Sequence, residues 1–333
     1  MKTVLITGGA GYVGSHCAKA FAAAGWNVVT FDNLSRGWRD SVRWGPLVQG
    51  DILDPSAIAE SLHQYRPDLV AHFAAVAYVE ESVLDPSLYY QNNCVGTLAL
   101  LDAMRKAACS RIVFSSTCAS YGLPVRFPID EEHPQAPINP YGWSKFMIER
   151  MLEHYGVAYN LASVSLRYFN AAGCDADGEI GEHHEPEPHV IPLAIAAALN
   201  QDRRFTIHGS DFDTRDGTAI RDYVHVSDLA RAHVLAGEML VKNGGTHVFN
   251  LGSGNGTTVM EVVRAVEKAT GKALPVLIGP RRRGDPPALV ASAEKAAREL
   301  GWSPTHSGID HIVETAMRWQ LRERAGNGDL QCK

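Results

Sequence analysis

Short apolar runs alternate with segments of helical spacing through the first half of the chain. The runs have the length of buried strands and lie at residues 4–6, 28–31, 47–48, 69–73, 111–114 and 161–166. Apolar positions with helical spacing lie between them, at residues 15–24, 55–65 and 86–107 and after Pro140. Strands separated by helices predict a parallel sheet with right-handed crossovers. We therefore predict an α/β fold with a Rossmann-like, doubly wound parallel sheet.

The pattern changes at residues 173–188, where glycine, proline and acidic residues replace the apolar runs. This stretch predicts a loop that leads into a smaller C-terminal α/β region. Helices are expected there at residues 190–200, 228–241, 257–270, 293–300 and 308–323, and strands near 205–207 and 249–251. We expect one domain over residues 1–172, a second region over 173–333, and a return of segments near 222–260 to the first domain.

The composition narrows the possible functional classes. The 333 residues are 45% hydrophobic and 20% charged, as in an ordinary globular protein. A net charge of −6 argues against nucleic acid or an anionic membrane as a partner. No apolar run approaches the about 18 residues of a membrane span, and the first residues are too few for a signal-peptide core. Six cysteines without a Cys-x-x-Cys pair fit reduced thiols, so we expect a cytoplasmic protein.

A glycine-rich turn follows the first predicted strand. Gly8-Gly9-Ala10-Gly11-Tyr12-Val13-Gly14 contains Gly-x-Gly-x-x-Gly and opens a predicted helix. Strand, glycine turn and helix form the context in which this motif binds a dinucleotide, because the backbone can approach a pyrophosphate at the helix N-terminus. Asp32 ends the second predicted strand, where a carboxylate binds the adenine ribose hydroxyls and repels a 2′-phosphate. The sequence therefore predicts NAD rather than NADP.

A tyrosine and a lysine lie four residues apart in Tyr141-Gly142-Trp143-Ser144-Lys145, just after Pro140. Proline at the start of a helical pattern predicts a first turn here, which puts both side chains on one face, roughly 6 Å apart along the axis. A nearby cation favours phenolate over phenol, so Lys145 could lower the pKa of Tyr141 toward that of a general base. A tyrosine and a lysine at this spacing are common by chance, so the spacing alone is weak evidence for a catalytic base. Thr117, at the end of the fifth predicted strand, should lie at the same sheet edge.

Two polar clusters lie in the second half. His183, His184 and His189 occur among acids, but glycines and prolines interrupt them and no helical His spacing is present, so we expect a solvated loop and no metal. Arg281-Arg282-Arg283-Gly284-Asp285 is the densest basic cluster of an acidic chain. Its guanidinium groups could either lie exposed to solvent or bind a phosphate group.

With these segments in place, the chain resembles the UDP-glucose 4-epimerase branch of the extended short-chain dehydrogenase/reductase family over nearly its whole length. The most specific motifs are Phe31-Asp32-Asn33-Leu34, Phe114-Ser115-Ser116-Thr117, Asn139-Pro140-Tyr141-Gly142-Trp143-Ser144-Lys145, Leu166-Arg167-Tyr168-Phe169-Asn170 and Arg221-Asp222-Tyr223-Val224-His225-Val226. The resemblance implies an NAD-dependent isomerase for UDP-glucose and UDP-galactose. It also implies a UDP-sugar site in the C-terminal region and a homodimer formed by the helices near 86–107 and 141–156. We expect the outer faces of these helices to carry the apolar residues Leu98, Leu101, Phe146 and Met147, although the sequence does not separate core from interface there.

The resemblance assigns roles to individual residues. Tyr141 would be the base, Lys145 would bind the nicotinamide ribose, and Thr117 would bond the reacting hydroxyl, although Ser is frequent there in the family. The implied cofactor contacts are Gly8, Gly11, Tyr12, Val13, Gly14, Asp32, Asn33, Asp51, Ile52, Phe73, Ala74, Asn92, Tyr141, Lys145 and Tyr168. The implied substrate contacts are Thr117, Tyr141, Asn170, His189, Val190, Arg221, Arg282, Asp285 and Leu289. Ala77 stands where relatives often have a cofactor-binding lysine, and His189 where many have Asn.

The implied reaction oxidises the sugar at C4, lets the 4-keto sugar rotate, and returns the hydride to the other face. A UDP-xylose/UDP-arabinose 4-epimerase would use the same residues and stays open. A 4,6-dehydratase needs an acid–base pair after Thr117, where Cys118-Ala119-Ser120 stands instead. A non-catalytic NAD-binding protein would not be expected to keep both Tyr141 and Lys145. Leu289 occupies the position that gates the sugar pocket in the family, so we expect N-acetylated sugars to be poor substrates.

Overall fold

The computed structural model describes residues 1–200, 202–282 and 285–330. Its main sheet has seven strands in the order β11-β6-β5-β4-β1-β2-β3, and all neighbours are parallel. The strands are β1 (Thr3–Thr7), β2 (Asn27–Asp32), β3 (Leu47–Gln49), β4 (Leu69–His72), β5 (Arg111–Thr117), β6 (Ala162–Tyr168) and β11 (Thr246–Leu251). The predicted Rossmann-like α/β fold is confirmed.

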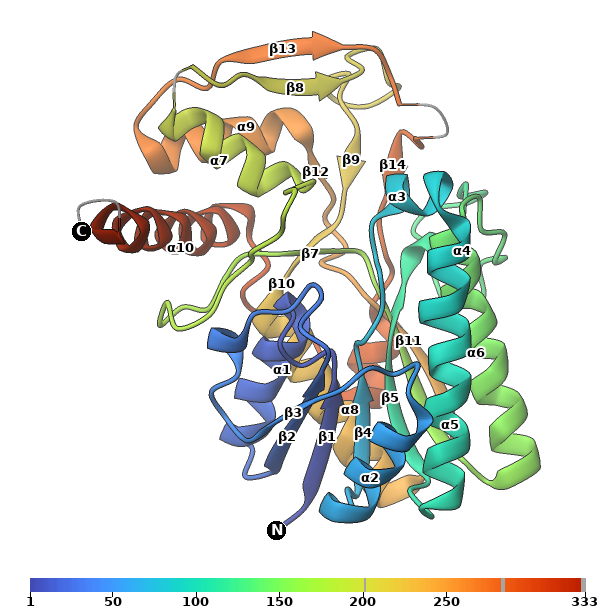
Figure 1. Cartoon of the computed structure of the whole chain (residues 1–333). Coiled ribbons are helices and arrows are strands. Elements are labelled where there is room, and N and C mark those ends of the chain that lie inside the picture. Colours follow the sequence, from blue (N-terminus) through green and yellow to red (C-terminus); the bar gives the residue numbers. More distant parts are fainter. Residues whose placement is uncertain (201, 283–284, 331–333) are drawn as a thin grey trace.

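Helices cover both faces of this sheet (Figure 1). Helices α1 (Tyr12–Ala23) and α8 (Val226–Asn243) pack together on one face, over a core that includes Phe21, Leu229 and Phe249. Three helices cover the other face, namely α2 (Pro55–Tyr65), α5 (Gly96–Lys106) and α6 (Pro140–Tyr159). Strand order changes direction between β1 and β4, the point at which ligands bind in such sheets.

The C-terminal region packs around its own core, which α7 (Val190–Leu199), α9 (Val259–Thr270) and α10 (Ile309–Leu330) share. Short strands complete it and join it to the main sheet: β7 (Asn170–Ala172), β8 (Phe205–His208), β9 (Ile220–Arg221), β10 (Tyr223–His225), β12 (Thr257–Thr258), β13 (Val276–Gly279) and β14 (Ala288–Leu289). Figure 1 shows this region beyond the carboxyl ends of the main strands.

The expected helix over residues 86–107 is confirmed as one continuous helical run over residues 86–106. It consists of α4 (Pro86–Tyr89), a π-helical segment η2 (Tyr90–Val95) and α5, and it is preceded by α3 (Val79–Leu84). Three shorter helical segments complete the fold: η1 (Arg39–Ser41), η3 (Cys118–Ser120) and η4 (Ala296–Leu300). Leu101 is buried in the core, so its prediction as an outer-face position is wrong, whereas Leu98 and Met147 are 42% and 40% exposed.

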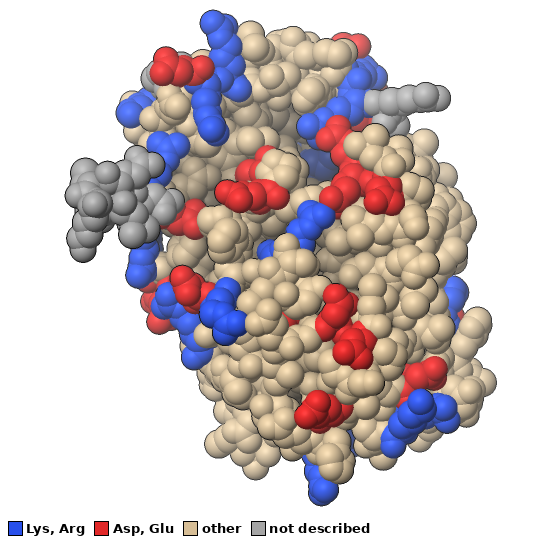
Figure 2. Space-filling model, viewed as in Figure 1, with Lys and Arg blue, Asp and Glu red and all other residues tan. Residues whose placement is uncertain are grey.

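Charges of both signs are interspersed over the face drawn in Figure 2. Within the described residues, no helix combines the length and the apolar composition that crossing a membrane requires. The five described cysteines are all free thiols, and Cys332 lies outside the described residues.

Candidate active site

Helix α6 begins where the sequence predicts. Asn139 caps it by accepting a hydrogen bond from the Gly142 backbone N–H over 2.8 Å, and Pro140 occupies the first turn, where its missing N–H costs nothing. This start directs Tyr141 and Lys145 toward the end of β5.

Lys145 is buried in the protein. Its Nζ donates to the Ser115 backbone carbonyl over 2.8 Å, and it lies 6.0 Å from the centre of the Tyr141 ring. Burial lowers the pKa of Lys145 to about 7, because an ammonium group loses hydration there. The charge of this side chain is therefore readily changed near neutral pH.

The Tyr141 side chain lies close to that of Thr117. Burial raises the pKa of Tyr141 to about 12, and the interaction with Thr117 offsets only part of this effect. Desolvation of the phenolate is the largest effect on this pKa among the protein's own groups. A lowering by Lys145 together with the positive charge of an oxidised nicotinamide stays a prediction.

Three hydroxyl groups meet at the carboxyl ends of β5 and β6. Thr117 lies beside Tyr168 in the parallel register, and the Tyr168 hydroxyl is 2.6 Å from Ser115 Oγ. Ser115 therefore contacts Tyr168 through its side chain and Lys145 through its carbonyl. Its part in the site was not predicted from the sequence.

The glycine turn fits a dinucleotide pyrophosphate. Gly8 has φ +71°, and a Cβ added to it would lie 2.5 Å from the Ala74 backbone nitrogen. A Cβ on Gly14 would collide with the Gly8 carbonyl. Side chains are excluded from this turn, so a ligand can reach the first N–H groups of α1, which have no partner within the helix.

Asp32 joins this turn to the end of β2. Its Oδ2 accepts from the Ala10 N–H over 3.0 Å and its Oδ1 from the Leu34 N–H over 2.8 Å. Burial raises the pKa of Asp32, although both hydrogen bonds oppose this. Asn33 donates to Asp51 over 2.8 Å, so these two predicted cofactor contacts lie together.

The remaining predicted cofactor residues lie around the same strand ends. Ile52 is buried, Phe73 packs against His233 with ring centres 4.7 Å apart, and Asn92 donates to Asn93 over 3.0 Å. The Tyr12 hydroxyl donates to the Gly173 carbonyl.

Several predicted substrate residues converge on β9 and β14. Arg221 forms an ion pair with Asp285, donates to the Pro286 carbonyl over 3.1 Å, and lies beside Leu289 in the strand register. Leu289 packs, together with Cys118, against a buried group of Tyr121, Ile129, Phe169 and Ala291. Cys118 follows Thr117, so this packing links the predicted pocket residue to the strand end that carries Thr117.

The other predicted substrate residues lie farther apart in the fold. Asn170 begins β7 and donates its backbone N–H to the Asp222 carbonyl over 2.9 Å. Val190 begins α7, and Arg282 is exposed. Arg283 and Gly284 of the basic cluster lie outside the described residues.

The loop before α7 is only in part the solvated loop expected from the sequence, because Glu185, Pro186, Pro188 and His189 are exposed but Glu182 is buried. His189 Nδ1 lies 2.8 Å from Glu182 Oε1 and 2.7 Å from Glu187 Oε1. These carboxylates raise the pKa of His189 to about 10, even though burial opposes the charge. Only Nε2 of the His189 ring is left for a ligand outside the cluster.

A buried ion pair behind Thr117 was also missed. Arg167 and Glu149 are 2.6 Å apart, and Ser116 donates to the same carboxylate over 2.5 Å. Glu149 follows Lys145 by four residues, so the helical spacing predicts that both face the sheet. This spacing could have identified Glu149 as a residue that faces the sheet, but not its partner on β6.

The residues of this site lie in a chain segment that matches a known family. Residues 4–252 match the model of the NAD dependent epimerase/dehydratase family. This chain belongs to that family. The epimerase motifs noted in the sequence are consistent with this membership.

Individual members of the family are similar over nearly their whole length. The UDP-glucose 4-epimerase of Rhizobium leguminosarum bv. trifolii is 50% identical over 321 residues, which cover 96% of this chain and 98% of that protein. The UDP-glucose 4-epimerase of Brucella ovis, solved in complex with NAD, is 51% identical with a TM-score of 0.94, covering 96% of this chain and 98% of that one. The enzyme from Stenotrophomonas maltophila, solved with NAD and formylated UDP-arabinopyranose, is 35% identical with a TM-score of 0.95, covering 98% and 100%.

Proposed function

We propose that this protein is a UDP-glucose 4-epimerase, which interconverts UDP-glucose and UDP-galactose with NAD as its cofactor. The observation that carries the proposal is the placement of Tyr141 beside Thr117 and buried Lys145, in a chain 50% identical to a UDP-glucose 4-epimerase. A base, a hydroxyl and a cation at the strand ends next to a dinucleotide turn suit the removal of a proton from a sugar hydroxyl.

The glycine turn and the ends of β2, β3 and β4 would hold NAD. The pyrophosphate would lie at the start of α1 and the adenine ribose at Asp32. The other contacts would come from Gly8, Gly11, Tyr12, Val13, Gly14, Asn33, Asp51, Ile52, Phe73, Ala74, Asn92 and Tyr168. When bound, NAD⁺ supplies the acceptor for the hydride of sugar C4 and a positive charge that favours the phenolate of Tyr141.

Tyr141 takes the proton of the sugar 4-hydroxyl, and Thr117 holds the same oxygen. Burial keeps Tyr141 protonated when only protein groups surround it, since its pKa is about 12. The base form therefore depends on positive charge gathered at the site, to which protonated Lys145 contributes. Tyr141 returns the proton after the 4-keto sugar has turned its other face.

The substrate contacts would keep the keto sugar in place during that rotation. Arg221 and Asp285, already paired, would face the nucleotide with Arg282, while Asn170, His189 and Val190 would line the sugar and phosphate path. Leu289 would border the sugar pocket. UDP then acts as the handle that retains the intermediate.

NAD and the UDP-sugar would be bound by different parts of the chain. Residues 1–172 would form the NAD-binding domain, to which segments near 222–260 return, and residues 173–333 mainly the UDP-sugar region. Exposed Leu98 and Met147 on α5 and α6 would pack in a homodimer. We place the enzyme in the cytoplasm, because the described cysteines are free.

The deciding experiment is conversion of UDP-galactose to UDP-glucose by purified protein without added NADH. Catalytic turnover is expected, since a cofactor that is reduced and reoxidised in place is not consumed. Absence of turnover with NAD bound would contradict the proposal. UDP-arabinose and UDP-N-acetylglucosamine should be assayed alongside, because the ratio of kcat/KM values decides the substrate, and we expect UDP-galactose to be preferred.

A further inference from the structure

Four side chains of the loop before α7 point into one small space. Glu182, His184, Glu187 and His189 each present one oxygen or nitrogen atom, and these atoms all lie within 4.8 Å of one another. His184 Nδ1 is 3.4 Å from Glu182 Oε1 and 3.5 Å from Glu187 Oε2. The ligand atoms of a tetrahedral zinc site are about 3.3 Å apart, because each lies about 2.0–2.1 Å from the metal.

Burial within the cluster is graded. The Glu182 side chain is 3% exposed and that of His184 is 17% exposed, whereas that of His189 is 45% exposed. Glu182 Oε1 and His184 Nδ1 are buried without a well-directed hydrogen bond among the described residues. Their nearest polar neighbours belong to the same cluster, since His189 Nδ1 lies 2.8 Å from Glu182 Oε1. A cation shared by the cluster would satisfy these buried atoms together.

Aromatic rings border the same space. The edges of Tyr12 and Tyr78 face His184, with ring centres 6.0 Å and 5.8 Å away. These walls limit the volume to a small group, and the ligand atoms are two carboxylate oxygens and two imidazole nitrogens. Such a mixed set suits zinc and related transition ions better than magnesium or calcium, which prefer oxygen alone.

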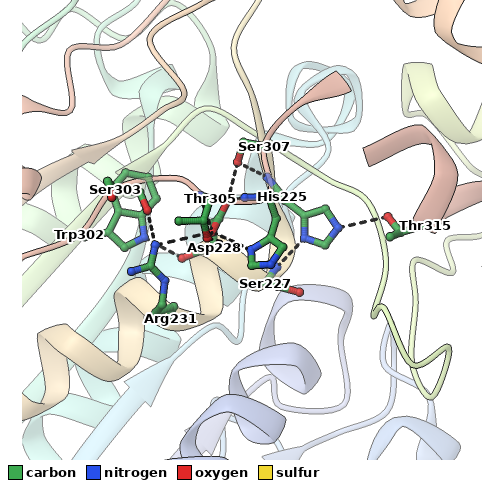
Figure 3. Close-up of polar contacts among 10 residues, drawn as sticks. His225, Ser227, Asp228, Arg231, Trp302, Ser303, Thr305, Ser307 and Thr315 are labelled. Atoms are coloured by element: carbon green, nitrogen blue, oxygen red, sulfur yellow. Dashed lines mark hydrogen bonds and ion pairs between the residues drawn. The ribbon is translucent and has the colours of Figure 1, made fainter. Parts of the chain in front are cut away.

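In two other polar clusters, the carboxylates are already paired with groups of the protein. Asp175, Asp177 and Glu179 already surround the Lys19 ammonium, with contacts of 2.7–2.9 Å. Asp228 accepts hydrogen bonds from Thr305, Ser307 and the His306 backbone (Figure 3). Both clusters are satisfied by protein groups and need no ion.

We propose that Glu182, His184, Glu187 and His189 bind one divalent transition-metal ion of the zinc type. Two carboxylates balance its charge, and two imidazoles complete a tetrahedral set once the ion has displaced the proton that these carboxylates otherwise hold on His189. The ion fixes the loop between β7 and α7 against the Tyr12 turn. The site does not depend on the epimerase proposal, since none of its ligands is the base. His189, which would also line the substrate path, would meet the ion through Nδ1 and leave Nε2 for the substrate.

The test uses the full chain purified with a chelator and then dialysed free of it. Isothermal titration with ZnCl₂ should give one bound ion per chain. His184→Gln and Glu182→Gln should weaken binding at least about tenfold, the scale on which even indirect partners affect a metal site. Glu187→Gln, at a more exposed position, replaces either variant if it does not fold.

Matched controls come from two neighbouring histidines. His183→Gln removes the adjacent imidazole, which pairs with Glu323 instead, and His306→Gln removes one that lies 3.2 Å from Asp228. Both should bind Zn²⁺ as the unaltered protein does. CoCl₂ should give the intense visible absorption of four-coordinate Co²⁺ with nitrogen and oxygen ligands.

Three results would overturn the proposal. They are Zn²⁺ binding that His184→Gln leaves unchanged, a pale six-coordinate Co²⁺ spectrum, and a near-ultraviolet thiolate band that assigns the ion to cysteine. Epimerase assays do not enter the test, so its failure and failure of the proposed reaction remain distinguishable.

Discussion

Arg167 and Glu149 form an ion pair that is almost completely inside the protein. Their side chains are 3% and 2% exposed, and the Arg167 guanidinium donates to both carboxylate oxygens. Ser116, which also donates to Glu149 over 2.5 Å, directly precedes Thr117. The pair therefore fixes the strand end beneath the proposed reacting hydroxyl.

Removing one partner of this pair should be costly. Glu149→Gln leaves the Arg167 charge buried without a counter-ion, and we expect the free energy of unfolding to fall by about 3–5 kcal/mol. Urea unfolding measures it. The matched control is Glu153→Gln on the same helix, whose partner Arg150 is 39% exposed; it should cost less than about 1 kcal/mol. Equal losses would show that burial of the pair does not matter.

Tyr141→Phe tests the proposed base. It removes only the hydroxyl, so folding should persist while kcat for UDP-galactose falls by about 10²–10⁴, the usual contribution of a general base. Tyr159→Phe, at the exposed end of the same helix, is the control and should keep full activity. A Tyr141→Phe enzyme as active as its parent would remove the mechanism.

Acid should destabilise the fold through buried histidines. Burial lowers the pKa of His72 to about 3 and of His16 and His233 to about 4, from 6.5. Folding favours their neutral form, so the stabilisation is complete above pH 6.5 and decreases as pH falls toward these values. Each fully neutral histidine should contribute about 1.4 kcal/mol per pH unit.

Urea unfolding at pH 7.5, 6.5 and 5 checks this slope. His72→Gln should reduce the change in unfolding free energy per pH unit by the contribution of one histidine. His154→Gln, which removes an exposed imidazole, should leave it unchanged. A slope that His72→Gln does not alter would contradict the assignment.

A charge at the centre of the proposed dimer interface should separate the subunits. Met147→Glu puts a carboxylate on an apolar face of α6, and sedimentation should change from dimer to monomer. Val157→Glu lies on the same helix at a position 91% exposed and should not change the oligomeric state. A parent protein that sediments as a monomer would contradict the interface directly.

Local sequence pattern predicted most of the fold because each strand and helix has its own apolar period. Asn139 and Pro140 predicted the start of α6, and the glycine motif at residues 8–14 predicted the tight turn between β1 and α1. Properties that arise from distant packing were not predictable. Burial is the largest effect on the pKa of Tyr141, and Leu101 could not be assigned to core or surface before α2 and α6 were placed around it.

The same distinction explains the loop before α7. Glycines, prolines and acids resemble a solvated linker when only neighbours in sequence are considered. The fold covers that loop with Tyr12 and Tyr78 and buries Glu182, so four scattered residues become one cluster. The pair of Arg167 and Glu149 was hidden for the same reason, since nothing local to Glu149 indicates its partner on β6.

Strand β11 lies at the edge of the main sheet beside β6, although 77 residues, from 169 to 245, separate them in the chain. Helix α8, which covers α1, comes from that same intervening stretch. During synthesis, β6 therefore remains an unpaired edge strand until residue 251 has left the ribosome. The apolar face that α8 covers remains exposed until α8 has also emerged. A nascent chain arrested before that point should depend on chaperones, because unpaired edges and exposed apolar surface promote aggregation.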